Sequence, residues 1–213
     1  MEIKNVIDAL EKARNISKHR NFVQSWDLII NLKGLDLKKP ENRFSIEFPL
    51  PEGRGKDVKV AVIADALATE AKKHADLVIQ KSEIETIAKN KKKLKKIARE
   101  YDFFLGEASL MPSIAKSFGT VLGPRGKIPK PIPPKAKMES LVAATKRMVR
   151  INLKESPVIH VTVGSEDMPE EKIERNMRAV FNFIRDRLPK GTTNIKSAQI
   201  KLTMGKPVKL KME

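Results

Sequence analysis

The chain has 213 residues, long enough for one large domain or two small ones with separate cores. Its 43 Lys and Arg against 26 Asp and Glu give a formal charge of +17, which favours a nucleic-acid partner, while an aromatic content of 5% makes membrane-surface binding the weaker interpretation. The absence of cysteine, of paired histidines, of an 18-residue apolar run and of a signal peptide argues against disulfides, metal centres and membrane spans, and predicts a soluble, cytoplasmic protein.

The N-terminal region alternates between helical and strand patterns. Apolar residues recur at helical spacing over residues 3–14, which predicts an amphipathic helix. A polar cationic loop at 17–21 leads to Phe22, which suits either a core position, the default, or a stacking platform for a base. Alternating patterns then predict strands over 25–32 and 44–48.

The prolines and glycines of residues 49–56 mark a domain boundary, and the hydrophobic pattern changes after it. Apolar runs at 58–64, 77–79 and 103–105 alternate with helical patterns, as expected of a parallel α/β sheet. The lysines of residues 89–99 share one helix face opposite the apolar residues, and a solvated face is the default interpretation of such a run.

Residues 116–137 contain six Lys or Arg and no acid, with five prolines between 124 and 134, and we expect a rigid basic loop. The segment 123–127 is similar to a phosphate-binding loop. However, Val121 stands where the motif needs glycine, and Ile128 where it needs Ser or Thr. No dinucleotide fingerprint follows any predicted strand. We therefore reject a nucleotide site and expect no cofactor.

The C-terminal third has the same alternating strands and amphipathic helices as the N-terminal region. A helix is expected over 141–147, strands over 149–153 and 158–163, and an amphipathic helix from Pro169 to Leu188. The last stretch, 195–212, alternates as two strands around a turn at 205–207 and predicts a hairpin, by default an ordinary edge hairpin.

The simplest topology joins both termini into one base domain with the middle inserted into it. We assign residues 1–53 and 148–213 to the base domain and residues 54–147 to the insert. Two chain crossings then form a hinge at Gly53, Gly55 and Met148, which permits relative motion of the domains.

Several short motifs are specific in combination. They are Arg20-Asn21-Phe22 with Ser25, Pro51-Glu52-Gly53-Arg54-Gly55-Lys56, Leu110-Met111-Pro112, the stretch from Leu122 to Pro131, and Thr203-Met204-Gly205. Over essentially its full length the sequence resembles the large ribosomal subunit protein L-one family in its archaeal form. One departure is Lys206, where many members have proline. We expect the turn to survive and the local charge to rise.

The resemblance implies an α/β protein. It would have an α+β base domain of antiparallel strands and two helices, and an inserted three-layer, Rossmann-like domain with a parallel sheet. It also implies a structural, non-enzymatic constituent of the ribosome that binds large-subunit rRNA to form the mobile stalk near the tRNA exit site. Such a protein represses translation by binding its own mRNA. The expected partners are therefore rRNA, its own mRNA, exit-site tRNA and the ribosome, and we expect a monomer when the protein is free.

The resemblance places the main RNA contact on the base domain, where the first strand starts and the last strand ends. The residues assigned to rRNA and mRNA binding are Lys18, Arg20, Asn21, Phe22, Ser25, Asp27, Lys154, Ser197, Thr203, Met204 and Gly205. Within this set, we expect the Thr203 hydroxyl and the Gly205 backbone to bind ribose 2′-hydroxyls or base edges, with Met204 and Phe22 in apolar contact. Asp27 would accept from a 2′-hydroxyl or base amine, or pair with Arg20 or Lys201. An auxiliary set in the basic loop, Arg125, Lys127 and Lys130, is assigned to tRNA.

Charge alone points elsewhere, because residues 54–147 carry 21 basic and 10 acidic residues against 22 and 16 in the rest. Phosphate attraction gives affinity with little specificity, whereas selective RNA recognition needs a shaped surface. We therefore assign specificity to the base domain and auxiliary electrostatics to the insert. Two alternatives remain: a basic binder held only by charge, and an enzyme on an α/β fold. The enzyme lacks a nucleophile–base pair, a metal cluster and a phosphate loop.

Overall fold

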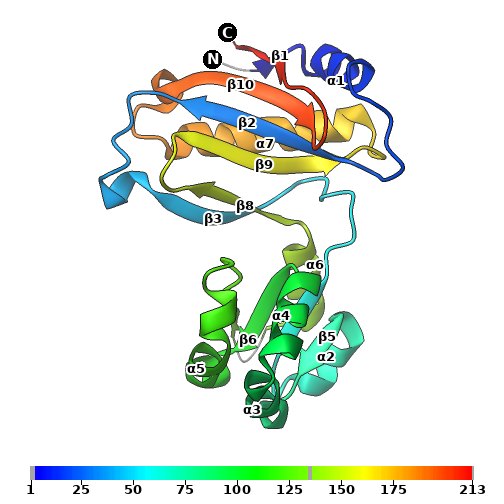
Figure 1. Ribbon diagram of the computed structural model, residues 1–213, viewed down its shortest axis with the longest axis vertical. Helices are drawn as coiled ribbons and strands as arrows, with labels where there is room; N and C mark the ends of the chain where they lie inside the picture. Colours follow the sequence, from blue (N-terminus) through cyan, green and yellow to red (C-terminus); the bar gives the residue numbers. More distant parts are fainter. Residues whose placement is uncertain (1–2, 134–135, 213) are drawn as a thin grey trace. The chain divides into compact units, whose positions relative to one another are not determined.

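The computed structural model describes residues 3–133 and 136–212, and Figure 1 shows its helices and strands. The chain divides into two compact units, Met1–Lys56 with Arg147–Glu213, here called the base unit, and Asp57–Lys146, the inserted unit. The base unit contains an antiparallel sheet and the inserted unit a parallel one, which confirms the predicted α/β class. This division begins the insert three residues later and ends it one residue earlier than we assigned from the sequence.

The base unit is built from strands of both chain ends. Its strands are β1 (Ile3–Lys4), β2 (Ser25–Leu32), β3 (Phe44–Pro49), β8 (Met148–Leu153), β9 (Val158–Ser165), β10 (Ile195–Leu202), β11 (Val208–Lys209) and β12 (Lys211–Met212). Its helices are α1 (Val6–Asn15), α7 (Glu170–Arg187) and the short 3-10 turns η1 (Pro40–Asn42) and η3 (Gly191–Asn194). The main sheet has the order β11-β10-β2-β9, and β3 pairs with β8, and β1 with β12, in separate two-stranded sheets.

The main sheet buries one face because its strands alternate with a period of two. Trp26, Leu28 and Ile30 of β2 are fully buried, in one core with α1 and α7, which lie against β10 and β9 on the same side (Figure 1). Asp27, Ile29 and Asn31, which alternate with them in β2, are only half-buried on the opposite face. This face of the sheet therefore carries polar side chains. At one end of the sheet, the start of β2 lies beside the end of β10.

Three sequence predictions need correction at the chain ends. Ile3 pairs with Met212 in a two-stranded sheet, so the first helix starts at Val6 and not at residue 3. The last long strand ends at Leu202, and Met204 lies outside it in a turn. The expected second strand of the hairpin is split, because β11 pairs with β10 whereas β12 pairs with β1. Pairing with the N-terminal strand thus replaces one continuous hairpin.

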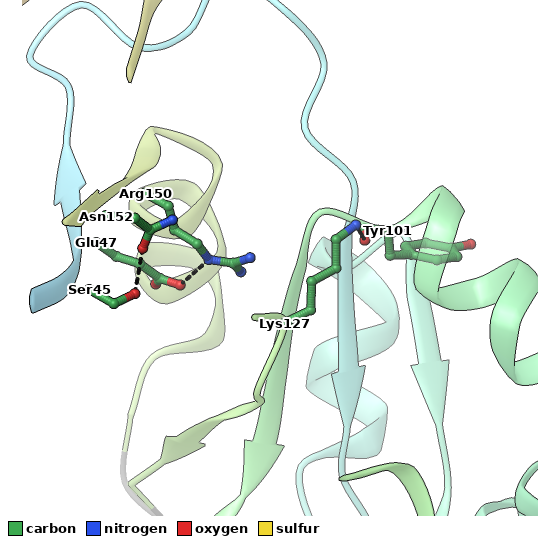
Figure 2. A network of polar contacts seen from close by, with 6 residues as sticks. All are labelled: Ser45, Glu47, Tyr101, Lys127, Arg150 and Asn152. Atoms are coloured by element: carbon green, nitrogen blue, oxygen red, sulfur yellow. Dashed lines mark hydrogen bonds and ion pairs between the residues drawn. The ribbon is translucent and has the colours of Figure 1, made fainter. Parts of the chain in front are cut away.

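The β3–β8 ribbon is linked by polar side chains on directly opposite residues. Arg150 Nε donates to Glu47 Oε1 at 3.1 Å, and Ser45 Oγ donates to Asn152 Oδ1 at 2.5 Å (Figure 2). Such cross-strand pairs stabilise this two-stranded ribbon. Its other face packs on α7 through Phe48, whose ring lies 4.7 Å from that of Phe183 between centroids.

The inserted unit alternates strands with helices. In chain order it has β4 (Val60–Ile63), α2 (Ala68–His74), β5 (Leu77–Ile79), α3 (Lys81–Lys89), α4 (Lys91–Glu100), β6 (Phe103–Glu107), η2 (Ala108–Leu110), α5 (Met111–Leu122), β7 (Lys130–Ile132) and α6 (Met138–Lys146). The four strands are parallel in the order β5-β4-β6-β7. Ala61, Ile63 and Phe104 share a core with α3, α4 and α5, while α6 contacts β4 and α2.

The stretch expected as a rigid basic loop is partly helical. Residues 116–122 belong to α5, because Ile114, Phe118 and Leu122 recur at helical spacing and are buried. Lys127 lies in the loop that follows, and its Nζ donates to the Tyr101 carbonyl oxygen at 2.6 Å (Figure 2). Pro134 and Lys135 lie outside the described residues.

A carboxylate of the protein lies at the ends of the two central strands of the parallel sheet, β4 and β6, where the strand order reverses. Glu107, at the end of β6, accepts the Asp65 backbone N–H at 2.9 Å, just after β4, and the Ser109 hydroxyl at 2.8 Å. These hydrogen bonds lower the pKa of Glu107, and the bond from the Asp65 backbone has the largest effect. In open α/β sheets this switch point between strands is where ligands bind. Here Glu107 itself takes the backbone donors.

Candidate nucleic-acid interface

The start of β2 and the end of β10 are neighbours in the sheet. Leu202 is opposite Trp26, and Lys201 is opposite Asp27. Just beyond β10, both the backbone N–H and the hydroxyl of Thr203 donate to the Ser25 carbonyl oxygen, at 3.0 and 3.1 Å. The structure thus brings together the two parts of the sequence that we assigned to RNA, Ser25 and its neighbours on one side and Thr203 on the other.

The turn after β10 is fixed by Gln24, which sequence reasoning missed. The Gln24 side chain is 3% exposed, and its Oε1 accepts the Met204 backbone N–H at 3.1 Å. The Gly205 N–H donates to the Leu202 carbonyl oxygen at 2.8 Å. A signal was present, because Gln24 continues the alternation of Trp26 and Leu28 and so places a polar side chain at a buried position.

These bonds use every backbone N–H of Thr203, Met204 and Gly205, together with the Thr203 hydroxyl proton. The Gly205 backbone was expected to bind RNA, and its N–H is used inside the turn instead. The turn presents acceptors instead: the lone pairs of the Thr203 hydroxyl and backbone carbonyl oxygens. Acceptors suit ribose 2′-hydroxyls and base amines and repel phosphate oxygens.

Large apolar side chains beside this turn face solvent. Phe22 is 55% exposed, Val23 56% and Met204 58%. The default of a buried Phe22 was wrong because Phe22 lies in the loop before β2, and the core at this end of the sheet is filled by Trp26, which is 0% exposed. An exposed aromatic ring next to an exposed methionine offers a surface on which a base or ribose can pack.

Gly205 is required by the close approach of α1. A Cβ on this residue would lie only 2.3 Å from the hydroxyl oxygen of Ser17 and 3.2 Å from the Leu202 Cβ. Ser17 is held in place because its hydroxyl donates to the Ala13 carbonyl oxygen at 2.6 Å, at the end of α1. The glycine therefore lets the turn pack on the helix. Ser17 is a second residue that the sequence did not reveal.

Asp27 lies on the half-exposed face of the sheet, in a row with Lys201 on one side and Thr162 on the other. Its Oδ1 accepts the Thr162 hydroxyl at 3.0 Å. As the alternative to an RNA contact, the sequence suggested Arg20 or Lys201 as a protein partner; the observed protein partner is instead Thr162, which lies opposite on the antiparallel neighbour.

The remaining base-unit residues do not all meet. Lys18, Arg20 and Asn21 are exposed in the loop that leads into β2. Ser197, whose hydroxyl accepts from Asn31 Nδ2 at 2.9 Å, lies six residues before Thr203, roughly 20 Å along the strand. Lys154 follows β8 directly and is close in sequence to Val158, which pairs with Asn31, so it too belongs to the far end of β2.

The auxiliary residues of the inserted unit are engaged within that unit. Arg125 Nη1 donates to the Lys95 carbonyl oxygen at 3.4 Å, and Lys127 Nζ donates to that of Tyr101. Lys130 begins β7, which pairs with β6.

Two further features of the described residues concern metal binding and membrane insertion. Within residues 3–133 and 136–212, no group of three or more His, Asp or Glu side chains is placed to hold a metal ion. In the same part of the chain, no helix combines the length and the apolar character needed to cross a membrane.

Comparison with known proteins decides the family. The model of the Ribosomal protein L1p/L10e family matches residues 10–206. The chain belongs to this family. The large ribosomal subunit protein uL1 of Methanothermococcus thermolithotrophicus is 47% identical over 211 residues, 99% of both chains. Its counterpart in Methanocaldococcus jannaschii is 46% identical over 214 residues, 100% of this chain and 98% of the relative. The uL1 protein of Pyrococcus abyssi is 47% identical over 208 residues, which are 97% of this chain and 95% of the relative.

Membership of the L1p/L10e family confirms the resemblance seen in the sequence and its archaeal form. The family is a structural, non-enzymatic one, which removes the hypothesis of an enzyme on an α/β fold.

Proposed function

We propose that this ribosomal protein binds large-subunit rRNA through the surface where β2 starts and β10 ends, here called the β2–β10 end surface. This surface consists of Phe22, Ser25, Asp27, Thr203, Met204 and Gly205, with Lys18, Arg20 and Asn21 at its edge. The single observation that carries the proposal is the Thr203–Gly205 turn, whose donors are all used inside the protein while its acceptors remain. The relatives named above are proteins of the large ribosomal subunit.

The chemistry of the β2–β10 end surface favours RNA over DNA. A 2′-hydroxyl is a donor that only RNA carries, and it matches the Thr203 hydroxyl lone pairs and the Asp27 carboxylate. The exposed Phe22 and Met204 supply apolar contact next to these acceptors. Attraction to phosphate comes from the cations around this surface, Lys18 and Arg20 among them, and sets orientation more than specificity. Ser197 and Lys154 extend the contact toward the far end of β2.

The inserted unit serves a second, less selective role in this proposal. It forms the mobile part of the stalk near the tRNA exit site, and Arg125, Lys127 and Lys130 contact the exit-site tRNA. Gly53 and Gly55, with φ of 72° and 66°, sit in a conformation that favours glycine and form the hinge. Met148, the third proposed hinge residue, is the first residue of β8 and pairs with Pro49 of β3, so the chain re-enters a strand there.

The free protein acts, in the same proposal, as a cytoplasmic monomer that also binds its own mRNA and represses translation. The argument is one of shared chemistry. An mRNA fold that presents the same 2′-hydroxyls and base edges as the rRNA competes for the β2–β10 end surface. The two RNAs are therefore mutually exclusive partners.

The test is a mobility-shift titration of the full chain against large-subunit rRNA fragments and a scrambled RNA at two salt concentrations. Selective, salt-tolerant binding of one fragment is expected for the wild type, and Thr203→Val with Met204→Ala abolishes it. Ile7→Ala, which truncates another exposed apolar residue on α1, is the control and binds like the wild type. Equal binding of every RNA, lost with salt, would show a binder held only by charge. Unchanged selectivity in the Thr203 and Met204 variant would place the site elsewhere.

A further inference from the structure

A hollow of about 530 Å³ opens beside Phe22, in the base unit. Its walls carry both signs of charge and an aromatic ring. They include Arg14, His19, Arg20, Phe22, Glu166 and Asp167. A hollow of this size holds a nucleoside. We propose that it is a pocket for one unpaired guanine of the bound RNA, stacked on Phe22 and read by the carboxylate of Glu166. This inference rests on the proposed RNA-binding function and names the base.

Glu166 is held rigidly at the wall of the hollow. Its Oε2 accepts the Gln24 N–H at 3.1 Å, and its own N–H donates to the Gln24 carbonyl oxygen at 2.8 Å. Its carbonyl oxygen accepts from Arg14 Nη2 at 3.4 Å. Three bonds thus fix both the backbone and the carboxylate of this half-buried residue, and a pre-placed group of this kind selects by geometry.

The carboxylate also has capacity to spare. In the described part of the chain, its second oxygen, Oε1, receives no hydrogen bond from another protein group. A structural role in holding the Gln24 N–H explains one oxygen only. In a region that binds a polyanion, a free carboxylate oxygen is unfavourable unless it meets a donor of the ligand. The donors of an RNA are its 2′-hydroxyls and its base N–H groups.

Guanine fits this acceptor best. Its Watson–Crick edge presents two adjacent donors, N1–H and the N2 amine. Oε1 can accept one of them, and Oε2 can accept the other with the lone pair that the Gln24 N–H does not use. Adenine and cytosine offer a single amine there beside an acceptor, and that acceptor repels the second oxygen. Arg14 and Arg20 also line the hollow and supply positive charge for the phosphates on either side of the base, while Arg14 additionally pairs with Glu170 at 3.7 Å. Phe22, more than half exposed, supplies the stacking face.

The probe is a set of single-stranded heptamers, UUUGUUU and the same sequence with inosine or adenine at the centre, measured by fluorescence anisotropy with the full chain. We expect the guanine heptamer to bind about tenfold more tightly than the inosine one, which lacks only the N2 amine. Glu166→Gln reverses the order of guanine and adenine, because an amide matches the donor–acceptor edge of adenine. Asp167→Asn removes the same charge one residue away and keeps the guanine preference.

Equal affinity for the three heptamers, or no binding of any at millimolar RNA, would overturn the pocket, as would equal effects of Glu166→Gln and Asp167→Asn. Phe22→Leu weakens all three heptamers alike if the ring stacks. The rRNA titration described above separates the two proposals. A wild type that prefers the guanine heptamer but selects no ribosomal fragment keeps the pocket and loses the proposed function, whereas selection of a fragment without guanine preference does the opposite.

Discussion

The buried side chain of Gln24 accepts the backbone N–H of Met204 at 3.1 Å and so ties the end of β10 to the loop before β2. The backbone of the same residue exchanges hydrogen bonds with Glu166, after β9. One amide residue therefore connects three segments that are far apart in the sequence. It holds the Thr203–Gly205 turn, the Phe22 loop and the wall of the guanine pocket in one arrangement.

Replacing Gln24 with methionine keeps the volume of the side chain but removes the acceptor for the Met204 N–H. The Met204 N–H is only part-buried, so the loss of its acceptor costs less than the roughly 1–3 kcal/mol of a fully buried N–H. We expect about tenfold weaker binding of the selected rRNA fragment and faster amide hydrogen exchange at Met204. Gln24→Glu retains an acceptor oxygen and is the matched variant, with slower exchange than Gln24→Met. Exchange at Met204 that matches the wild type in both variants would show that the turn does not depend on this bond.

A methyl group on Gly205 tests the contact between the turn and α1. Gly205→Ala places a Cβ 2.3 Å from Ser17 Oγ, and overpacking of this kind costs about 1–3 kcal/mol. The turn must shift, so RNA affinity falls. Ser17→Ala removes the opposing oxygen, and the double variant should recover part of the loss, limited by the Leu202 Cβ at 3.2 Å. A double-mutant cycle on RNA affinity and unfolding free energy measures this coupling. Strictly additive effects would argue against the contact.

The sequence predicted the strands and helices whose pattern reflects burial. The β2 alternation and the apolar stripe of α7 follow from packing against a core, so their residues show it directly. The core position that was the default for Phe22 was wrong because an apolar residue was expected to be buried, whereas Phe22 lies in the loop before β2 and is exposed. The Gln24 and Ser17 contacts depend on which segments meet in space. A residue pattern does not contain that information, and the β1–β12 pairing was missed on the same grounds.

Glu107 makes the stability of the inserted unit depend on pH. Its backbone and hydroxyl partners lower its pKa below the ordinary value of 4.5. The carboxylate therefore contributes its full stabilisation above about pH 4.5, and this contribution is lost as the pH falls through the lowered pKa. We expect Glu107→Gln to cost about 1 kcal/mol at pH 7 and progressively less below pH 4.5. Amide exchange in β4 of the full chain, compared between wild type and variant at pH 7 and at pH 3, measures this loss of stability. Glu85→Gln, on the exposed side of α3, is the control, and a cost for Glu107→Gln that stays constant with pH would contradict the assignment.

Asn176 fixes the first chain crossing to the base unit. Its side chain is 0% exposed, donates to the carbonyl oxygens of Gly53 and Val163 at 2.9 and 2.8 Å, and accepts the Glu52 N–H at 3.0 Å. Asn176→Ala leaves these three backbone groups without their partner, and we expect a loss of about 3 kcal/mol in unfolding free energy.

Asn182→Ala makes the same change at an exposed position of α7 and should cost less than about 0.5 kcal/mol. Denaturant unfolding of the full chain, with amide exchange at Glu52, separates the two variants. Asn176→Ala releases the Glu52 amide because its acceptor is gone, whereas Asn182→Ala leaves it protected. If the Glu52 amide stays protected in Asn176→Ala, the crossing is held by other contacts, such as the ion pair of Glu52 with Arg175 at 3.0 Å.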